Sequence, residues 1–382
     1  MADGKSNLSG TVPLGPAART KICVLVIGMH RSGTSALTRV LNLLGTDLPK
    51  ILIGSGPGNE SGHWEPQRIV LLNDRLLSEA GSSWDDWSRF DLSKLAPERI
   101  TEYKAELGRL LREDCGDSSL FVIKDPRIAR LLPLVREVGL AENIDIRVAL
   151  VFRNPIEVVD SLEKRKETWT QGYTRADAAL LWLRHMLDAE AASRDITRVI
   201  VSYDGLLKDW RSCVGRLLDG LHIPLPPPSV EVAANIEAFL SASQRHHQHT
   251  INDVRLDPSM KTWVADAYEA LQLLEAESKA DTAFQTLNRV GDQFDSAESA
   301  IRLLLSDAKT QHTRVTDALR KTLAGRDAET LVLREQVAAL QEKAVLRKAE
   351  QAEAGSFDLL AQLMPGEVTW RKFVRRLANR KG

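Results

Sequence analysis

The chain has 382 residues, a length that predicts two or three folding units and is ample for a large hydrophobic core. Hydrophobic residues make up 43% and charged residues 27%, which excludes a wholly disordered or collagen-like chain. The 51 Lys and Arg residues nearly balance the 52 Asp and Glu residues, so the net charge of −1 gives no indication of nucleic-acid binding, and we expect none.

Residues 1–20 are polar and lack the apolar centre of a secretory signal, so we expect a disordered arm. No run approaches the roughly 18 apolar residues that a membrane span requires. The longest apolar stretch, Ile22–Met29, has the length of a strand. The three cysteines are scattered and odd in number, which excludes a closed disulfide framework and favours a reducing compartment. Together these features predict a cytoplasmic protein.

Four short β-rich runs follow along the chain, separated by segments with helical spacing. Near-continuous apolar strands that alternate with helices are typical of a parallel sheet covered on both faces. The sequence therefore predicts a three-layer α/β sandwich over residues 21–255, with helices over 35–44 and 156–166 directly after the first and third strands. The predicted strands are KICVLVIG (21–28), LFVIK (120–124), IRVALVFR (146–153) and RVIVSY (198–203).

The composition changes after about residue 255 and becomes rich in Ala, Leu, Glu, Lys and Gln. Apolar residues spaced by three and four predict a long helix or helical hairpin over 256–364, with the stripe of a coiled coil. We expect this extension to mediate homo-oligomer formation or partner binding; the alternative is a hairpin folded back on the α/β domain. The stripe contains Leu287, Val290, Phe294, Ala297, Ile301 and Leu304 and, after a break near Gly325, Leu333, Val337, Leu340 and Ala344.

Residues 365–382 have the pattern of a basic amphipathic helix, with Trp370, Phe373 and Leu377 on one side and Arg and Lys residues around them. An anionic membrane surface or an acidic partner would fit such a tail. We therefore expect peripheral contact with the inner face of a membrane, with a solvated tail as the alternative.

Residues Gly28–Ser35 (GMHRSGTS) follow the first predicted strand and open a predicted helix. In that place free backbone N–H groups and the positive end of the helix dipole converge on one anion. Gly28 and Gly33 have the spacing of the nucleoside-triphosphate loop, but Thr34 stands where that loop needs Lys. The loop therefore predicts an anion site and disfavours a triphosphate; a strand–helix turn without a ligand is the alternative.

The stretch HRSGTS resembles the 5′-phosphosulfate loop of sulfotransferases that use 3′-phosphoadenosine 5′-phosphosulfate (PAPS). Arg31 stands where many members have Lys, and the next four positions match in order. The resemblance implies that this loop binds the donor through Arg31, Ser32, Gly33, Thr34 and Ser35.

A second stretch strengthens the resemblance. Arg153-Asn154-Pro155 closes the third predicted strand, and Ser161 follows Arg153 by eight residues, which is similar to the family's 3′-phosphate site. Arg offers planar paired donors to a phosphate, and a hydroxyl on the next helix completes the site. Tyr203 lies in a stretch, VSYDGLL, that resembles the family's Tyr-Glu-Asp-Leu segment after the last strand, and we include it among the donor-binding residues.

Sulfuryl transfer needs positive charge at the leaving phosphate and a base for the acceptor hydroxyl. Arg31 and Lys124, which follows the second strand as a Lys does in the family, are the expected cations. The resemblance places an acidic base in the stretch Gly62–Glu65 (GHWE), where Glu65 is the first candidate and Glu60 and His63 are rivals. The family's cytosolic branch uses a His after the Lys, but here that place holds Pro126.

The resemblance covers about residues 20–250 and implies a PAPS-dependent sulfotransferase whose acceptor is a carbohydrate or polysaccharide hydroxyl. PAPS would be the donor substrate, and we expect no metal because the chain shows no clustered His, Cys and Asp ligands. Two alternatives remain: a nucleotide or nucleoside kinase on a P-loop scaffold, and an inactive sulfotransferase-like scaffold that acts through its coiled coil.

Overall fold

The computed structural model of the chain describes residues 20–54, 62–116, 118–164, 174–242, 249–260 and 262–363. Its centre is a sheet of four parallel strands in the order β2-β1-β3-β4. The strands are β1 (Lys21–Ile27), β2 (Leu120–Lys124), β3 (Ile144–Phe152) and β4 (Arg198–Ser202), which confirms the four predicted strands and their parallel arrangement to within two residues at each end. The strands are almost uniformly apolar because helices cover both faces of the sheet.

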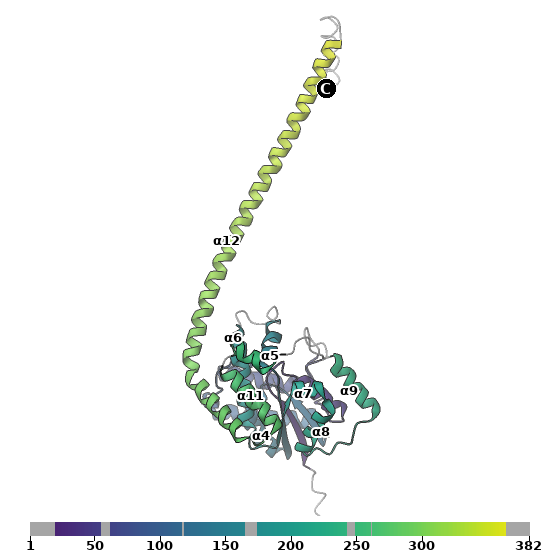
Figure 1. Cartoon of the computed structure of the whole chain (residues 1–382), viewed down its shortest axis with the longest axis vertical. Helices are drawn as coiled ribbons and strands as arrows, with labels where there is room; N and C mark the ends of the chain where they lie inside the picture. Colours follow the sequence, from purple (N-terminus) through teal and green to yellow (C-terminus); the bar gives the residue numbers. More distant parts are fainter. Residues whose placement is uncertain are drawn as a thin grey trace, which may run out of the picture. The chain divides into compact units, whose positions relative to one another are not determined.

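Helices make up most of the remaining described chain (Figure 1). The predicted helices after the first and third strands are confirmed as α1 and α5. The helices are α1 (Thr34–Leu43), α2 (Gln67–Glu79), α3 (Pro97–Cys115), α4 (Ile128–Ala141), α5 (Pro155–Glu163), α6 (Arg175–Ala192), α7 (Tyr203–Lys208), α8 (Trp210–Gly220), α9 (Val230–Ala242), α10 (Ile251–Leu256), α11 (Trp263–Ala276) and α12 (Asp281–Leu363), with a short 3-10 turn at Leu92–Lys94.

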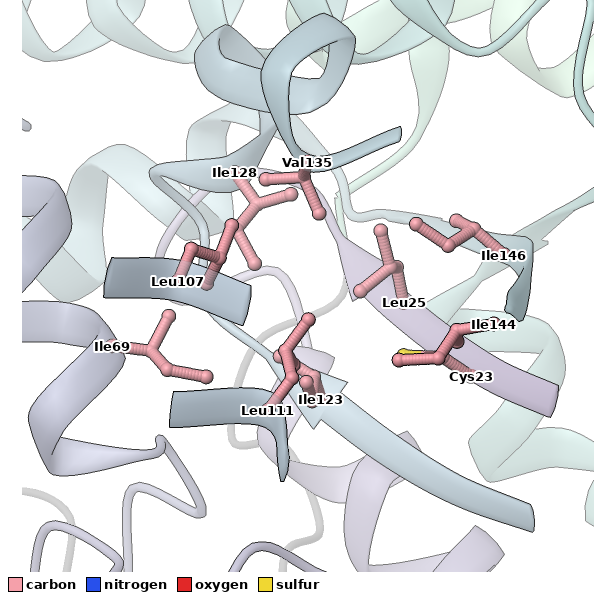
Figure 2. Close-up of a pocket in the computed structure, with 10 residues that line it drawn as sticks. All are labelled: Cys23, Leu25, Ile69, Leu107, Leu111, Ile123, Ile128, Val135, Ile144 and Ile146. Atoms are coloured by element: carbon pink, nitrogen blue, oxygen red, sulfur yellow. The ribbon is translucent and has the colours of Figure 1, made fainter. Parts of the chain in front are cut away.

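The two faces of the sheet bury different helices. Val24 and Val26 of β1 belong to a core with residues of α1, α7, α8 and α9. Their neighbours Cys23 and Leu25 point to the opposite face, because side chains alternate along a strand. There they meet Ile69 of α2, residues of α3 such as Leu107, and residues of α4, as Figure 2 shows. The predicted three-layer α/β architecture is therefore confirmed.

The carboxyl ends of all four strands lie at one edge of the sheet, because every strand pair is parallel. The chain passes from β1 to β2 on one side of β1 and then returns to β3 on the other side. In open α/β sheets, ligands bind in the crevice at such a reversal of strand order. The segments that follow β1 and β3 therefore lie at the place where this fold positions a site.

The chain divides into two compact units, residues 1–300 and 301–382. Helix α12, drawn from green to yellow in Figure 1, begins in the first unit and runs through Gly325 without interruption, so no hairpin forms over 281–363. Leu287, Val290 and Phe294 are buried in the first unit, where Phe294 stacks on Trp87 at 5.9 Å between ring centroids. The first positions of the predicted stripe thus pack within the chain. The predicted domain boundary near residue 255 stays a prediction.

Later positions of the stripe are exposed in the second unit: Leu304, Leu333, Val337 and Leu340 are each more than half accessible to solvent. An apolar stripe along a helix is typical of a chain that pairs with another helix. Self-association through residues 301–363 therefore remains our prediction.

Deleting residues 301–382 should remove self-association and leave the first unit folded. Deleting residues 261–382 should instead unfold it, because α11 and the start of α12 supply buried side chains such as Leu271, Leu274 and Phe294. Each buried large apolar side chain contributes about 1.5–3 kcal/mol, against a total stability of about 5–15 kcal/mol. Light scattering and thermal melting of the two truncated chains and the full chain test this. A monomeric full chain would contradict the self-association.

Two predicted segments, the arm over residues 1–20 and the basic tail over 365–382, lie outside the described residues apart from Thr20. Among the helices of the described ranges, none combines the length and the apolar character needed to cross a membrane.

Candidate functional site

The segment Gly28–Gly33 connects β1 to α1 and places the predicted anion loop at the carboxyl edge of the sheet. Gly28 and Gly33 have φ of 141° and 92°, and Arg31 adopts a φ of 69°, which is unusual for a residue with a side chain. A Cβ at Gly28 would lie 2.1 Å from the carbonyl oxygen of Val151, so only glycine fits. The loop is thus tightly held against β3, in a backbone conformation of the kind that concentrates at ligand sites.

The start of α1 presents the loop's hydroxyl groups. Ser32 and Thr34 are buried, and Ser32 Oγ has no hydrogen-bond partner among the residues that the structure describes. Gly33 occupies the N-cap position and no side chain caps the helix. The N-terminal N–H groups of a helix and its dipole favour an anion at this end. Ser35 has a hydrogen-bond partner: its Oγ donates to the carbonyl oxygen of His63 at 3.2 Å.

The second predicted anion motif lies directly beside this loop. Arg153 follows β3, and its Nη1 donates to the carbonyl oxygen of Arg31 at 3.2 Å. In turn, Arg31 Nε donates to Ser161 Oγ of α5 at 2.9 Å. The two motifs, which are more than a hundred residues apart in sequence, are therefore joined by two hydrogen bonds. They form two adjacent positions with positive charge.

Arg153 is oriented from two directions. Its Nε donates to Glu157 Oε2 at 2.8 Å, and the Glu157 side chain is only 1% exposed. The guanidinium also lies over the ring of Tyr203, 5.1 Å from its centroid. Tyr203 in turn lies against the loop, since a Cβ at Gly33 would be 2.2 Å from Tyr203 Cδ2. These contacts bring the predicted donor-binding residues of three strand ends together.

Lys124, the last residue of β2, pairs with Glu65. Lys124 Nζ lies 2.5 Å from Glu65 Oε1 and also donates to the carbonyl oxygen of His63 at 3.2 Å. Arg127 Nη1 lies 3.7 Å from the other Glu65 oxygen, Oε2. Glu65 and Lys124 are each 4% exposed. Buried charges of this kind need opposite charges beside them, and here one carboxylate meets two cations.

This charged pair is anchored to the helices behind it. Arg127 pairs with Asp125 at 3.0 Å and with Asp74, and Asp125 Oδ2 accepts from Asn73 Nδ2 at 2.8 Å. Asn73 Oδ1 accepts from the buried hydroxyl of Tyr103 at 2.7 Å. Burial, with a smaller contribution from the charge of Asp125, raises the pKa of Tyr103, so this hydroxyl remains a donor. The network fixes the end of β2 and holds Lys124 in place.

The structure thus brings most of the predicted site residues to the carboxyl edge of the sheet. His63 contributes its backbone carbonyl to Ser35 and Lys124. Glu60 lies outside the described residues, so its place in the site is untested. No group of three or more His, Cys, Asp or Glu side chains suited to a metal ion occurs in the described part of the chain.

Two charged or titratable residues of the site were missing from the sequence-based set. Arg127 belongs to the KDPR stretch, and its position just after a strand end is the signal that could have identified it. His30 belongs to the anion loop itself, where its ring contacts Trp84 at 4.5 Å between centroids. Burial is the main cause that lowers the pKa of His30, and nearby Arg127 lowers it further, which favours the neutral imidazole.

Comparison with protein-family models gives no match for this chain. Comparison with curated proteins also gives none. Solved structures with a similar arrangement include the sulfotransferase domain from the curacin biosynthetic pathway, with 16% identity and a TM-score of 0.35 over 64% of this chain and 96% of that one.

Two further solved structures have the same identity and TM-score, 16% and 0.35. Sulfotransferase STF1 from Mycobacterium tuberculosis H37Rv matches over 67% of this chain and 76% of that one. The sulfotransferase domain of the Synechococcus PCC 7002 olefin synthase matches over 66% and 97%. Similarity at this level does not decide what this chain does, and its function has to be argued from its own site.

Proposed function

We propose that this chain is a sulfotransferase that moves a sulfuryl group from PAPS to a hydroxyl group of a carbohydrate or polysaccharide. The observation that carries the proposal is the direct contact between the two anion motifs, through Arg31 Nε on Ser161 Oγ and Arg153 Nη1 on the Arg31 carbonyl. A ligand with anionic groups at both its 5′ and 3′ ends suits two adjacent cationic positions. The 5′ end would take the β1–α1 loop, and the 3′-phosphate would take Arg153 and Ser161.

The proposed reaction uses the pair at the end of β2. Glu65 accepts the proton of the acceptor hydroxyl while the hydroxyl oxygen bonds to sulfur and the bond between sulfur and the 5′-phosphate oxygen breaks. The electron pair of that bond stays on the phosphate, where Lys124 and Arg31 neutralise the added charge. The distance of 2.5 Å between Lys124 Nζ and Glu65 Oε1 supports this arrangement, because it places one of the two cations directly beside the proposed base.

The proposed donor is distinguished from a nucleoside triphosphate by Thr34, which occupies the position of the lysine that reaches the β- and γ-phosphates in triphosphate loops. The acceptor class rests on the resemblance to the sulfotransferase family as a whole and not on a particular residue of this chain. In this scheme the other residues of the site bind the donor or orient the side chains that bind it, and only Glu65, Lys124 and Arg31 take part in the transfer. Tyr203, for example, supports Arg153 through its ring.

The test of the proposed function is a thermal-shift experiment with 3′,5′-adenosine bisphosphate, the product that remains after sulfuryl transfer. At 100 times its dissociation constant a ligand stabilises the folded chain by about 2.7 kcal/mol, which raises the melting temperature by several degrees. We expect this shift without added metal and a much smaller one with ATP and Mg²⁺. A larger, magnesium-dependent shift with ATP would overturn the proposal in favour of a kinase.

A further inference from the structure

Two buried polar atoms of the anion loop lack hydrogen-bond partners among the described residues: Ser32 Oγ and His30 Nε2. Buried polar atoms in folded proteins are nearly always paired, so an unpaired one calls for a partner such as a ligand or a water molecule. Ser32 already belongs to the proposed donor-binding residues. His30 does not, although it occupies the same loop.

The ring of His30 is held by aromatic neighbours. It meets the ring of Trp84 edge-on at 4.5 Å between centroids and lies 6.1 Å from the ring of His185. His185 Nε2 lies 2.9 Å from the carbonyl oxygen of Trp84 and donates to it, because a carbonyl only accepts. Trp84 and His185 therefore pack against His30 and hold the orientation of its ring.

His30 and Arg31 are consecutive residues of the loop that differ in their described contacts. Arg31 reaches Ser161 on the helix after β3, which is the proposed 3′ side. The charges that act on His30 include Lys124 and Arg127, at the end of β2, where the proposed transfer takes place, and Arg31 of its own loop. His30 therefore lies within electrostatic reach of the end of β2, where the proposed transfer takes place.

The imidazole of His30 lies near charged or titratable groups on several elements: Arg31 in its own loop, Lys124 at the end of β2, Arg127 after it, and His185 on α6. Together with burial, which is the largest cause, these groups lower the pKa of His30. The ring is then neutral at pH 7, and a neutral imidazole carries one N–H donor. Such a donor suits an anionic oxygen and does not change its charge with pH in the neutral range.

We propose, on the basis of the proposed function, that His30 is a sulfuryl-binding residue whose Nε2–H donates a hydrogen bond to a sulfuryl oxygen of PAPS. The contact would distinguish the sulfated donor from the bisphosphate product, which lacks that group. Donation to a charged oxygen would persist as sulfur moves from the phosphate to the acceptor. His30 would thereby help to orient the sulfuryl group between Lys124 and the acceptor hydroxyl.

The experiment compares the affinities of PAPS and 3′,5′-adenosine bisphosphate by calorimetric titration of the full chain without acceptor. His30→Phe keeps a ring of similar size against Trp84 and removes both nitrogens. We expect it to weaken PAPS binding by roughly 10- to 100-fold, as loss of a hydrogen bond to a charged group predicts. Bisphosphate binding should change less than about twofold, by the same reasoning. His30→Leu gives the same comparison if His30→Phe does not fold.

Thr46→Val is the matched control, because it removes another buried polar atom without a partner among the described residues, outside the anion loop. It should leave the ratio of the two affinities unchanged. Equal losses of PAPS and bisphosphate affinity in the His30 variants, or none, would overturn the role of His30 alone. A wild-type chain that binds neither compound would instead overturn the proposed function.

Discussion

Replacing Glu65 by Gln should lower turnover by roughly 10²–10⁴ and leave the affinity for 3′,5′-adenosine bisphosphate nearly unchanged. Gln keeps the shape and the hydrogen-bonding size of the side chain but cannot accept the proton. The donor is held elsewhere, by the β1–α1 loop, Arg153 and Ser161. The measurement is the rate of sulfuryl transfer from labelled PAPS to an acceptor found by screening glycans, together with a bisphosphate titration.

The ion pair with Lys124 requires a control, because Glu65→Gln also leaves a buried ammonium without its carboxylate. Asp74→Asn removes the most exposed of the three carboxylates that pair with Arg127, without touching Lys124. It should leave turnover nearly unchanged. Lys124→Ala should lower the whole pH–rate curve, whereas Glu65→Gln should abolish its acid limb. Near-normal turnover in Glu65→Gln would transfer the role of base to Glu60 or His63.

Replacing Arg153 by Ala should weaken PAPS binding by roughly 2–5 kcal/mol, because a paired, charge-assisted contact to a phosphate is lost. The loss should be smaller for adenosine 5′-phosphosulfate, which has no 3′-phosphate. Calorimetric titration of both compounds measures the difference. Equal losses for the two compounds would show that Arg153 does not recognise the 3′-phosphate.

Two further variants separate recognition from folding. Arg153→Ala leaves the Glu157 carboxylate buried without its cation, so the double variant Arg153→Ala/Glu157→Gln should recover stability without recovering the affinity for PAPS. Arg147→Ala alters an arginine of the same strand that pairs with Asp145 and with the carbonyls of Leu221 and His222. It should leave the affinities for both compounds unchanged.

The elements that position the site could be predicted from the sequence because their signals are local. A run such as KICVLVIG is apolar at nearly every position, which is typical of a strand buried on both faces. Parallel strands then bring Arg31, Lys124 and Arg153 to one edge without further information. The end of β4 shows the limit of this approach: Tyr203 fits the strand pattern, but Ser202 accepts from the Gly205 N–H and begins α7 at Tyr203.

Partners of side chains could not be predicted, because they depend on contacts between distant segments. Spacing alone identifies Leu287, Val290 and Phe294 as an apolar stripe, yet it does not tell whether another copy or the same chain covers them. The structure buries them within the first unit. In the same way, the sequence offers Glu65 and Lys124 as separate candidates, and only the fold shows that they form one ion pair.

The contact between Gly33 and Tyr203 restricts the substitutions that these two positions can accept. Any other residue at position 33 would meet the Tyr203 ring at 2.2 Å and would also have to adopt a φ of 92°, at a cost on the order of 1–3 kcal/mol. A smaller residue at position 203 would relieve only the clash and would remove the ring beside Arg153. Position 33 thus admits only glycine, for two independent reasons, and a smaller residue at position 203 does not make another residue acceptable there.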